Sequence, residues 1–189
     1  MATTDPIRDT AQIHMLAAYY LQRGQLRNYA LISLGIYSVL RIGDLLTLKW
    51  ADVYDDRQHT FRSHLTLKEQ KTGKVKTIAL NPQAICALRT YYPCRDGTFI
   101  FASRNGDRPI SRVQAWRIIK TAAESLHMAG NIACHSLRKT WGYHAWTSGG
   151  ISPVVIMNIY NHSDFKVTQR YLGVMQDDLD RAYLQMTLF

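Results

Sequence analysis

The chain has 189 residues, of which 47% are hydrophobic, and this composition fits one folded domain and excludes a disordered segment. Its 23 lysines and arginines outnumber its 14 acidic residues, and the net charge of +9 favours a polyanionic partner, with an ordinary basic protein as the alternative. The three cysteines form no C-x-x-C pair, so the sequence predicts no disulfide framework, no metal site and no cofactor, and it fits a reducing compartment.

The ends and apolar runs of the chain predict a cytoplasmic protein. Charged residues at Asp5, Arg8 and Asp9 are not those of a signal peptide. No apolar run approaches the roughly 20 residues that a membrane-spanning helix needs.

The first part of the chain predicts helices. Apolar residues recur at helical spacing over 10–22 and 25–39, and the second of these segments is apolar enough to be buried. A short helix is expected at "GDLLTL", residues 43–48, directly after Arg41.

A β-hairpin is expected next. Residues 60–68 alternate apolar and polar side chains, which is the period of a strand with one wet face. "KTGK" at 71–74 predicts a turn, and 75–80 predicts the return strand.

The rest of the chain again predicts helices, apart from a short extended piece at 98–103. Pro82 follows Asn81 at a first helical position, Ser111 caps a long helix, and Ser152 precedes Pro153 at another start. These helices span residues 82–91, 112–128, 135–147, 153–160, 164–171 and 177–186. The predicted fold class is mainly α with a small antiparallel β-sheet (α+β).

Several polar residues are not required by the helical pattern. Arg41 stands between two apolar runs, where burial needs an anionic partner, and a structural pair with Asp44 is the alternative to a functional role. His135 and Arg138, spaced i and i+3, project from one side of a helix, although a solvated polar face would give the same pattern.

Two further residues stand near the C-terminus. His162 lies in a tight link between two short helices, where a capping or core-edge histidine is the alternative to a site residue. Tyr171 ends the following helix, where core packing is the alternative.

Together, four separated segments resemble the signature of the tyrosine recombinases, also called phage integrases. "LRIGDLLTLKWADV" is similar to the family's first arginine box and "KTGKVKTIAL" to its catalytic-lysine hairpin. "HSLRKT" is similar to its His-x-x-Arg box and "NHSDFKVTQRY" to its closing His-to-Tyr box. The resemblance covers nearly the whole chain and implies the catalytic-domain architecture over residues 1–189.

The chain departs from the family pattern at two positions near the closing box. Asn161 stands where the family usually has glycine, and we expect a positive φ there, which asparagine tolerates best after glycine. Gly173 stands where the family often has a histidine, and nothing is inferred from that difference.

The segment before the first arginine box is also short. Only about 40 residues precede Arg41, and no separate N-terminal core-binding domain is visible. We expect either an isolated catalytic domain or a naturally short member such as the fimbrial-switch invertases.

The resemblance implies a site-specific DNA recombinase or integrase of a mobile element. Tyr171 would attack a DNA phosphodiester, release a 5′-hydroxyl and form a 3′-phosphotyrosine, with no ATP or metal. Arg41 and Arg138 would donate hydrogen bonds to the phosphoryl oxygens, because a planar guanidinium can donate two. His162 would be a third donor.

The resemblance also implies two proton-transfer roles. Lys71 is similar to the family's general acid, which would protonate the leaving 5′-oxygen, and Lys68 and Lys74 are its rivals. A tyrosine of ordinary pKa is neutral at pH 7, so Tyr171 must lose a proton during attack. His135 would accept that proton or position the phosphate.

The expected partners are double-stranded DNA and further copies of the chain, assembled as a homotetramer on DNA. An apolar strip near the C-terminus would dock on a neighbouring subunit or pack on its own domain. Its residues are Leu179, Tyr183, Met186, Leu188 and Phe189. A DNA-binding accessory protein without cleavage and a type IB topoisomerase are the alternative functions.

Overall fold

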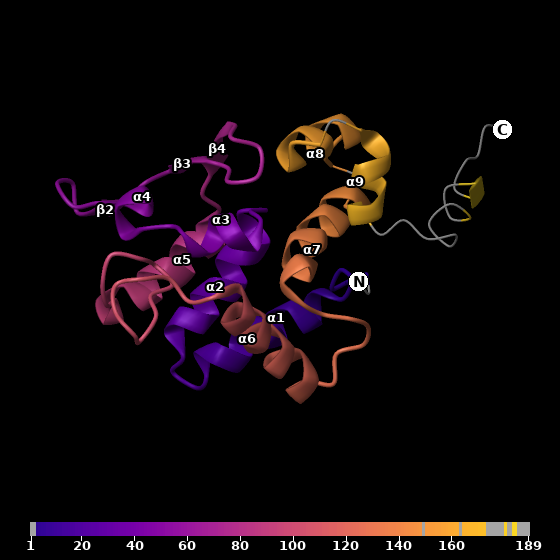
Figure 1. The fold of residues 1–189 in the computed structure, drawn as a ribbon. Coiled ribbons are helices and arrows are strands. Elements are labelled where there is room, and N and C mark those ends of the chain that lie inside the picture. The colour runs from indigo at the N-terminus through magenta and orange to yellow at the C-terminus, as the bar shows by residue number, and fades with distance from the viewer. Residues whose placement is uncertain (1–2, 149, 163, 173–179, 181–182, 185–189) are drawn as a thin grey trace.

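The computed structural model describes residues 3–148, 150–162 and 164–172, with residues 180, 183 and 184. Four long helices form the body: α1 (Thr10–Leu21), α2 (Leu26–Tyr37), α5 (Pro82–Tyr91) and α6 (Arg112–Ser125). Helices α7 (Cys134–Thr147), α8 (Pro153–Tyr160) and α9 (Phe165–Leu172) rise along one side of this body (Figure 1).

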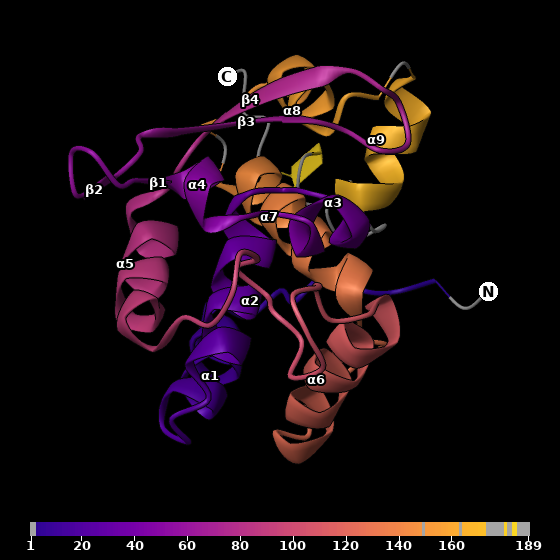
Figure 2. The same cartoon turned by 60° about the vertical axis from the view of Figure 1, so that its left-hand side comes forward.

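Helix α2 is the centre of the fold. It packs against α1, α5 and α7, and every residue from 30 to 36 is buried, as its apolar sequence predicts. Figure 2 shows α2 running between α1 and the N-terminal part of α7. A buried α2 fixes the chain that follows it, because Val39 and Leu40 remain in the core and Arg41 then leads into α3 (Ile42–Leu46).

The predicted helix boundaries agree closely with the structure, because local capping signals set them. Asp9 caps α1, Ser111 caps α6 and Ser152 caps α8, each by accepting a hydrogen bond from a backbone N–H of the first turn. The long helix predicted to reach residue 128 ends earlier, at Ser125, and His127 already has a φ of 50°.

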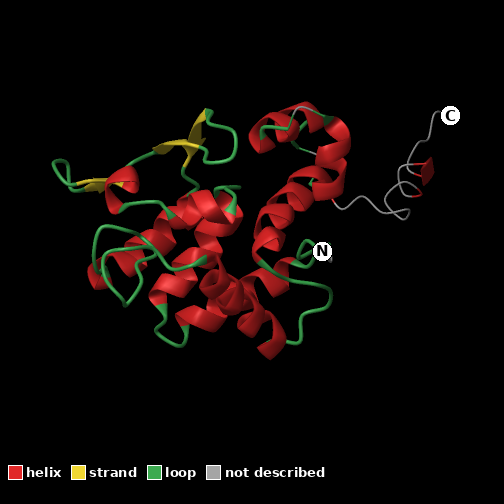
Figure 3. Ribbon diagram, in the orientation of Figure 1, coloured by secondary structure: helices red, strands yellow, loops and turns green. Residues whose placement is uncertain are grey.

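Strands are confined to one end of the molecule, as Figure 3 shows in yellow. The strand predicted over 60–68 is wrong as a single element, because it is divided into β2 (Thr60–Phe61) and β3 (His64–Lys68). The chain changes partner between them: the N–H of Arg62 donates to Val53 O at 2.8 Å, whereas Ser63 O accepts from the N–H of Leu80 at 2.8 Å.

The division produces two antiparallel two-stranded sheets among the described residues. Strand β2 pairs with β1 (Tyr54–Asp55), and β3 pairs with β4 (Val75–Ala79) as the predicted hairpin, with Lys68 opposite Val75. The sequence did not predict β1, the short helix α4 (Trp50–Val53) or the 3₁₀ turn η1 (Tyr92–Cys94). The fold class, mainly α with small antiparallel sheets, is confirmed.

In the part of the chain that the structure describes, no helix is both long and apolar enough to cross a lipid bilayer. Most of the predicted helix at 177–186 lies outside the described residues.

Candidate active site

Arg41 is anchored by a carboxylate, as its apolar surroundings predict, but the partner is Glu69 and not Asp44. Its Nη1 donates to Glu69 Oε1 at 2.8 Å, and the Arg41 side chain keeps 23% of its surface exposed while that of Glu69 is fully covered. Asp44 instead accepts the backbone N–H of Gln70 on Oδ1 at 2.9 Å. The guanidinium of Arg41 is therefore held in place with part of its surface open.

Glu69 is the functional residue that sequence reasoning missed most clearly. Its Oε2 accepts hydrogen bonds from Thr72 Oγ1 at 2.7 Å and from Asn161 Nδ2 at 2.9 Å. Burial alone would raise the pKa of this carboxyl, but the two hydrogen bonds and the charge of Arg41 hold it below its ordinary value. The available signal was an isolated acid within a basic hairpin, two residues before Lys71.

Through these contacts Glu69 joins three distant segments: the start of α3, the turn of the β3–β4 hairpin and the link between α8 and α9. Asn161 in that link has φ 56° and ψ 41°, so the positive φ expected from its sequence position is confirmed. Its Oδ1 also accepts from Lys74 Nζ at 3.4 Å, which ties the hairpin to the same link.

Arg138 lies below the surface of the site, with 1% of its surface exposed. Its Nη1 donates to Val39 O, its Nη2 donates to Tyr160 O at 2.9 Å, and its guanidinium lies 4.6 Å from the centre of the Tyr160 ring. The phenol of Tyr160 donates in turn to Arg138 O at 2.7 Å. Arg138 thus connects the end of α2, the start of α7 and the end of α8.

The two histidines share one electrostatic environment with the two arginines. His135 is exposed at the surface of α7, but desolvation by the protein around its ring and the charges of Arg138, Lys139 and Arg41 lower its pKa to about 4. Burial and the charges of Arg138, Arg41 and His135 lower the pKa of His162 to about 4. The contacts agree, because Glu69 binds both Arg41 and the Asn161 that precedes His162, and Tyr160 both accepts from Arg138 and stacks on His162. With pKa values of about 4, both imidazoles are neutral at pH 7.

His162 is also fixed by its neighbours. Its ring stacks on Tyr160 with 5.1 Å between centres and 9° between planes, and its Nδ1 lies 3.1 Å from the hydroxyl of Thr168, which is fully buried. The imidazole is therefore oriented by one contact from α8 and one from α9.

Of the three candidate lysines, Lys71 is the one that lines a cavity together with Arg41. It stands exposed in the hairpin turn and, with Arg41, lines an open cavity of about 420 Å³. Lys68 lies within β3, and Lys74 reaches Asn161.

Lys76 is a second residue that sequence reasoning missed. Its Nζ donates to Ile159 O at 2.6 Å and so connects β4 to α8. Burial, followed by the charge of Arg138, lowers the pKa of its ammonium group to about 8. This half-buried lysine, which interacts electrostatically with Arg138 and Arg41, strengthens the positive potential of the cluster.

Tyr171 lies in α9, which packs against α7 and α8. Its side chain lies outside the described part of the structure. Of the apolar strip near the C-terminus, Tyr183 is described and is 82% exposed, and the other four residues lie outside the described part of the chain.

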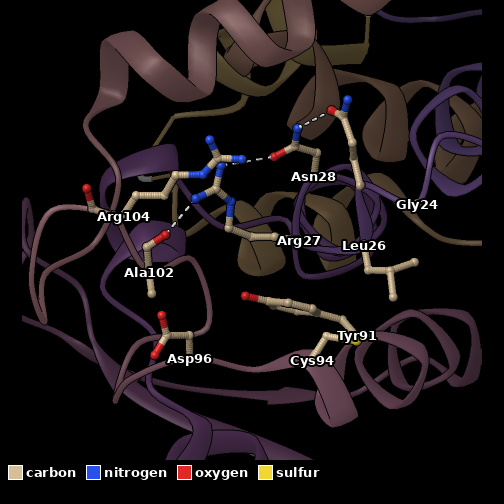
Figure 4. Close-up of a pocket in the computed structure, with 11 residues that line it drawn as sticks. Gly24, Leu26, Arg27, Asn28, Tyr91, Cys94, Asp96, Ala102 and Arg104 are labelled. Atoms are coloured by element: carbon tan, nitrogen blue, oxygen red, sulfur yellow. Dashed lines mark hydrogen bonds between the residues drawn. The ribbon is translucent and has the colours of Figure 1, made fainter.

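Another cavity of about 420 Å³ lies between the start of α2, the end of α5 and the loop that carries Ala102 (Figure 4). There Arg27 donates from Nη1 to Ala102 O at 2.7 Å and from Nη2 to Asn28 Oδ1 at 3.4 Å. None of the predicted site residues lines this cavity, so we place the candidate active site at the arginine–histidine cluster.

Comparisons with known proteins identify the family of the chain. The model of the phage integrase family matches residues 9–177. The chain is 33% identical over 184 residues to the probable integrase/recombinase YoeC of Bacillus subtilis, covering 97% of each chain. It is 28% identical over 161 residues to the tyrosine recombinase XerC of Neisseria gonorrhoeae, covering 83% of this chain but only 50% of that relative.

Solved structures show the same fold. The crystal structure of XerA recombinase has a TM-score of 0.77 and 21% identity, and the match covers 97% of this chain and 64% of XerA. XerH site-specific recombinase, bound to its palindromic difH substrate after cleavage, has a TM-score of 0.77 and 13% identity, covering 98% of this chain and 54% of XerH. By sequence and by fold, the chain belongs to the phage integrase family, the tyrosine recombinases, and has the fold of their catalytic domain.

Proposed function

We propose that this protein is a site-specific DNA recombinase that cleaves and rejoins DNA through a 3′-phosphotyrosine at Tyr171. The observation that supports the proposal is the arrangement around Glu69 and Tyr160, which brings Arg41, Arg138 and His162 to one region, with His135 one helical turn before Arg138 on α7. The charges of Arg41 and Arg138 also lower the pKa values of both histidines. A net charge of +9 and the DNA-bound state of the XerH relative support DNA as the substrate.

The reaction begins with attack of the Tyr171 phenol oxygen on a DNA phosphorus. A phosphorus–oxygen bond forms to the tyrosine, the bond from phosphorus to the 5′-oxygen breaks, and the bond energy is kept in the phosphotyrosine. A second 5′-hydroxyl reverses the step and reseals the strand, which is how one strand is exchanged for another.

The cations of the cluster suit the charge that develops on the phosphoryl oxygens. Arg41 is held by Glu69 through Nη1 and is still 23% exposed, so the rest of its guanidinium can donate to a phosphate. Removing one preorganised donor of this kind typically lowers the rate by ~10²–10³. Arg138 is buried, so it contributes positive charge beneath the surface of the site. Its hydrogen bond to Tyr160 O holds α7 and α8 together.

Proton transfer is assigned to two side chains. His135 is neutral at pH 7 and can accept the phenol proton, and the arriving phosphate raises its basicity because it offsets the charges of Arg138, Lys139 and Arg41. Lys71, in the exposed turn beside Arg41, delivers a proton to the leaving 5′-oxygen.

Strand exchange between two duplexes needs four nucleophiles, so the proposed active assembly is a homotetramer on DNA, with the C-terminal segment of each chain docked on its neighbour. Deleting residues 177–189 should then abolish recombination and leave the fold intact. Loss of the fold would mean that the segment packs on its own domain.

The test uses a pool of nicked duplexes of randomised sequence, in which cleavage traps a covalent protein–DNA adduct. Wild-type protein should yield adducts whose sequenced DNA ends reveal the target, and Tyr171→Phe should yield none. DNA binding without any adduct would indicate an accessory protein. Relaxation of supercoiled plasmid without a preferred sequence would indicate a topoisomerase.

A further inference from the structure

The cavity beside Arg41 contains a third basic side chain that the catalytic scheme does not use. It is lined by Arg41, Lys71 and Arg112 from three different elements, and its volume is about 420 Å³. The remaining lining residues are Ile42, Gly43, Asp44 and Gln70.

Arg112 is placed by tight local packing. It is the first residue of α6, directly after Ser111, whose hydroxyl accepts from Gln114 N at 3.1 Å while Gln114 Oε1 accepts from Ser111 N at 2.8 Å. This capping box fixes the point from which the Arg112 side chain leaves the helix.

The guanidinium of Arg112 lies against Gly43. A Cβ atom built on Gly43 would stand 2.5 Å from Arg112 Nη2 and 3.1 Å from Cζ. Any larger residue at position 43 would displace the guanidinium, so the glycine of the "RIGD" segment creates the room in which Arg112 rests.

The charges around this cavity are incompletely balanced. Arg41 is paired with Glu69, but within the described part of the chain neither Arg112 nor Lys71 forms an ion pair. Asp44 supplies a carboxylate to the cavity, and its Oδ1 already accepts from Gln70 N. Three cations around one open cavity favour an anion within it.

Arg112 stands apart from the reacting cluster. It lies on α6, whereas His135 and Arg138 lie on α7 and His162 lies in the link between α8 and α9. The cavity places Arg112 beside Arg41 and Lys71, and its lining includes neither histidine nor Arg138.

We propose that this cavity binds a second, non-scissile phosphate of the DNA backbone, and that Arg112, seated on Gly43, is the residue dedicated to it. The inference rests on the proposed function, since it takes DNA as the ligand. Such a contact would fix the register of the strand so that the neighbouring phosphate lies at Arg41 and Lys71.

The test measures binding of a short duplex of arbitrary sequence over a range of salt concentrations, in a Tyr171→Phe background so that no covalent product forms. Losing one phosphate contact should reduce the slope of log K against log salt by about 0.9. We expect this reduction for Arg112→Ala, and we expect Arg112→Lys to keep most of the slope because it keeps the charge.

Gly43→Ala is the informative companion, because it removes no charge and only pushes the guanidinium away. As a single substitution, Gly43→Ala should weaken DNA binding. In the Arg112→Ala background it should weaken DNA binding no further. Arg117→Ala is the matched control: at about 100° per residue, position 117 points roughly 140° away from position 112 on the same helix. Unfolding temperatures of all variants should match the parent.

An unchanged salt slope in Arg112→Ala would overturn the inference, as would additive effects of Gly43→Ala and Arg112→Ala. When Arg112→Ala is made in the protein that keeps Tyr171, kcat/KM for adduct formation should fall, and most of the fall should be a rise in KM. A loss confined to kcat would overturn the inference by placing Arg112 at the scissile phosphate. Failure of the wild-type protein to form any adduct would instead contradict the proposed recombinase function.

Discussion

Glu69 accepts a 2.8 Å hydrogen bond from Arg41 across 28 residues of sequence, and this ion pair fixes the hairpin turn against α3. The same carboxylate accepts from Asn161, so one buried acid positions both the arginine and the link that carries His162. The site is therefore organised around a carboxylate to which the proposed mechanism gives no chemical step.

Replacing Glu69 should disturb activity more than its lack of a chemical role suggests. Glu69→Ala leaves Arg41 and Asn161 without their acceptor, and we expect a loss of about 1–3 kcal/mol in unfolding free energy. Displacement of Arg41 should also lower adduct formation by up to ~10². Glu69→Gln keeps the shape and should be milder.

Glu124→Gln is the matched control, because Glu124 forms only an exposed pair with Lys120 at 3.8 Å and should change neither quantity. Denaturant unfolding and single-turnover cleavage measure the two effects. If Glu69→Ala matches the control in both, Glu69 does not organise the site.

Lys71 can be separated from its rivals by the chemistry of the leaving group. Lys71→Ala should slow cleavage by ~10²–10⁴, because the 5′-oxygen then leaves without a proton. In a substrate with sulfur in place of the bridging 5′-oxygen, the leaving group departs as a thiolate and needs no proton. This substrate should therefore restore the rate of Lys71→Ala. Cleavage assays with both substrates measure this, and a thio rescue of Lys68→Ala or Lys74→Ala, but not of Lys71→Ala, would reassign the general acid.

The two neutral histidines predict a pH-dependent stability. The pKa of each is lowered from 6.5 to about 4, so between these values the unfolded chain binds more protons than the folded chain. Stability should therefore fall as the pH decreases from about 6.5 toward 4, and His162→Asn should flatten this dependence.

His59→Asn is the control for that experiment, since His59 is exposed in the β1–β2 turn and asparagine tolerates its φ of 50°. Its unfolding should keep the parental pH profile. A His162→Asn profile as steep as that of the parent would show that His162 is not held neutral by the fold.

The close packing of Tyr160 on α7 predicts a sharp cost at Gly142. Alanine normally favours a helix, but a Cβ at this position would stand 2.1 Å from the Tyr160 hydroxyl oxygen. Gly142→Ala should cost about 1–3 kcal/mol and disturb the contacts of Arg138 with Tyr160.

Gly150→Ala provides the comparison, because a Cβ there meets nothing within 4 Å. Adding Tyr160→Phe to Gly142→Ala should recover part of the lost stability, since it removes the clashing oxygen. Thermal unfolding of the four proteins tests this, and equal stability of Gly142→Ala and Gly150→Ala would contradict the packing described here.

Sequence reasoning was most reliable where the cause is local. The predicted caps Ser111 and Ser152 directly precede the helices that they start, and the positive φ of Asn161 follows from its place in the closing box. The predicted strand over 60–68 failed because its division depends on Val53, a backbone partner outside that segment.

The candidate site shows the same limit. The motifs indicated that Arg41, His135, Arg138 and His162 gather, but not that Arg138 would be covered by Tyr160, because burial depth depends on the packing of α7 against α8. The sequence offered Asp44, three residues away, as the alternative structural partner of Arg41, because nothing in the local sequence shows that the hairpin brings Glu69 close.

The most direct test of the account is to identify the amino acid that becomes linked to DNA. The adduct captured from the nicked pool is digested with protease and nuclease, and the modified peptide is sequenced by mass spectrometry. We predict a nucleotide joined through its 3′-phosphate to Tyr171. Linkage to another residue, linkage through a 5′-phosphate, or an equal yield from Tyr171→Phe would contradict the account.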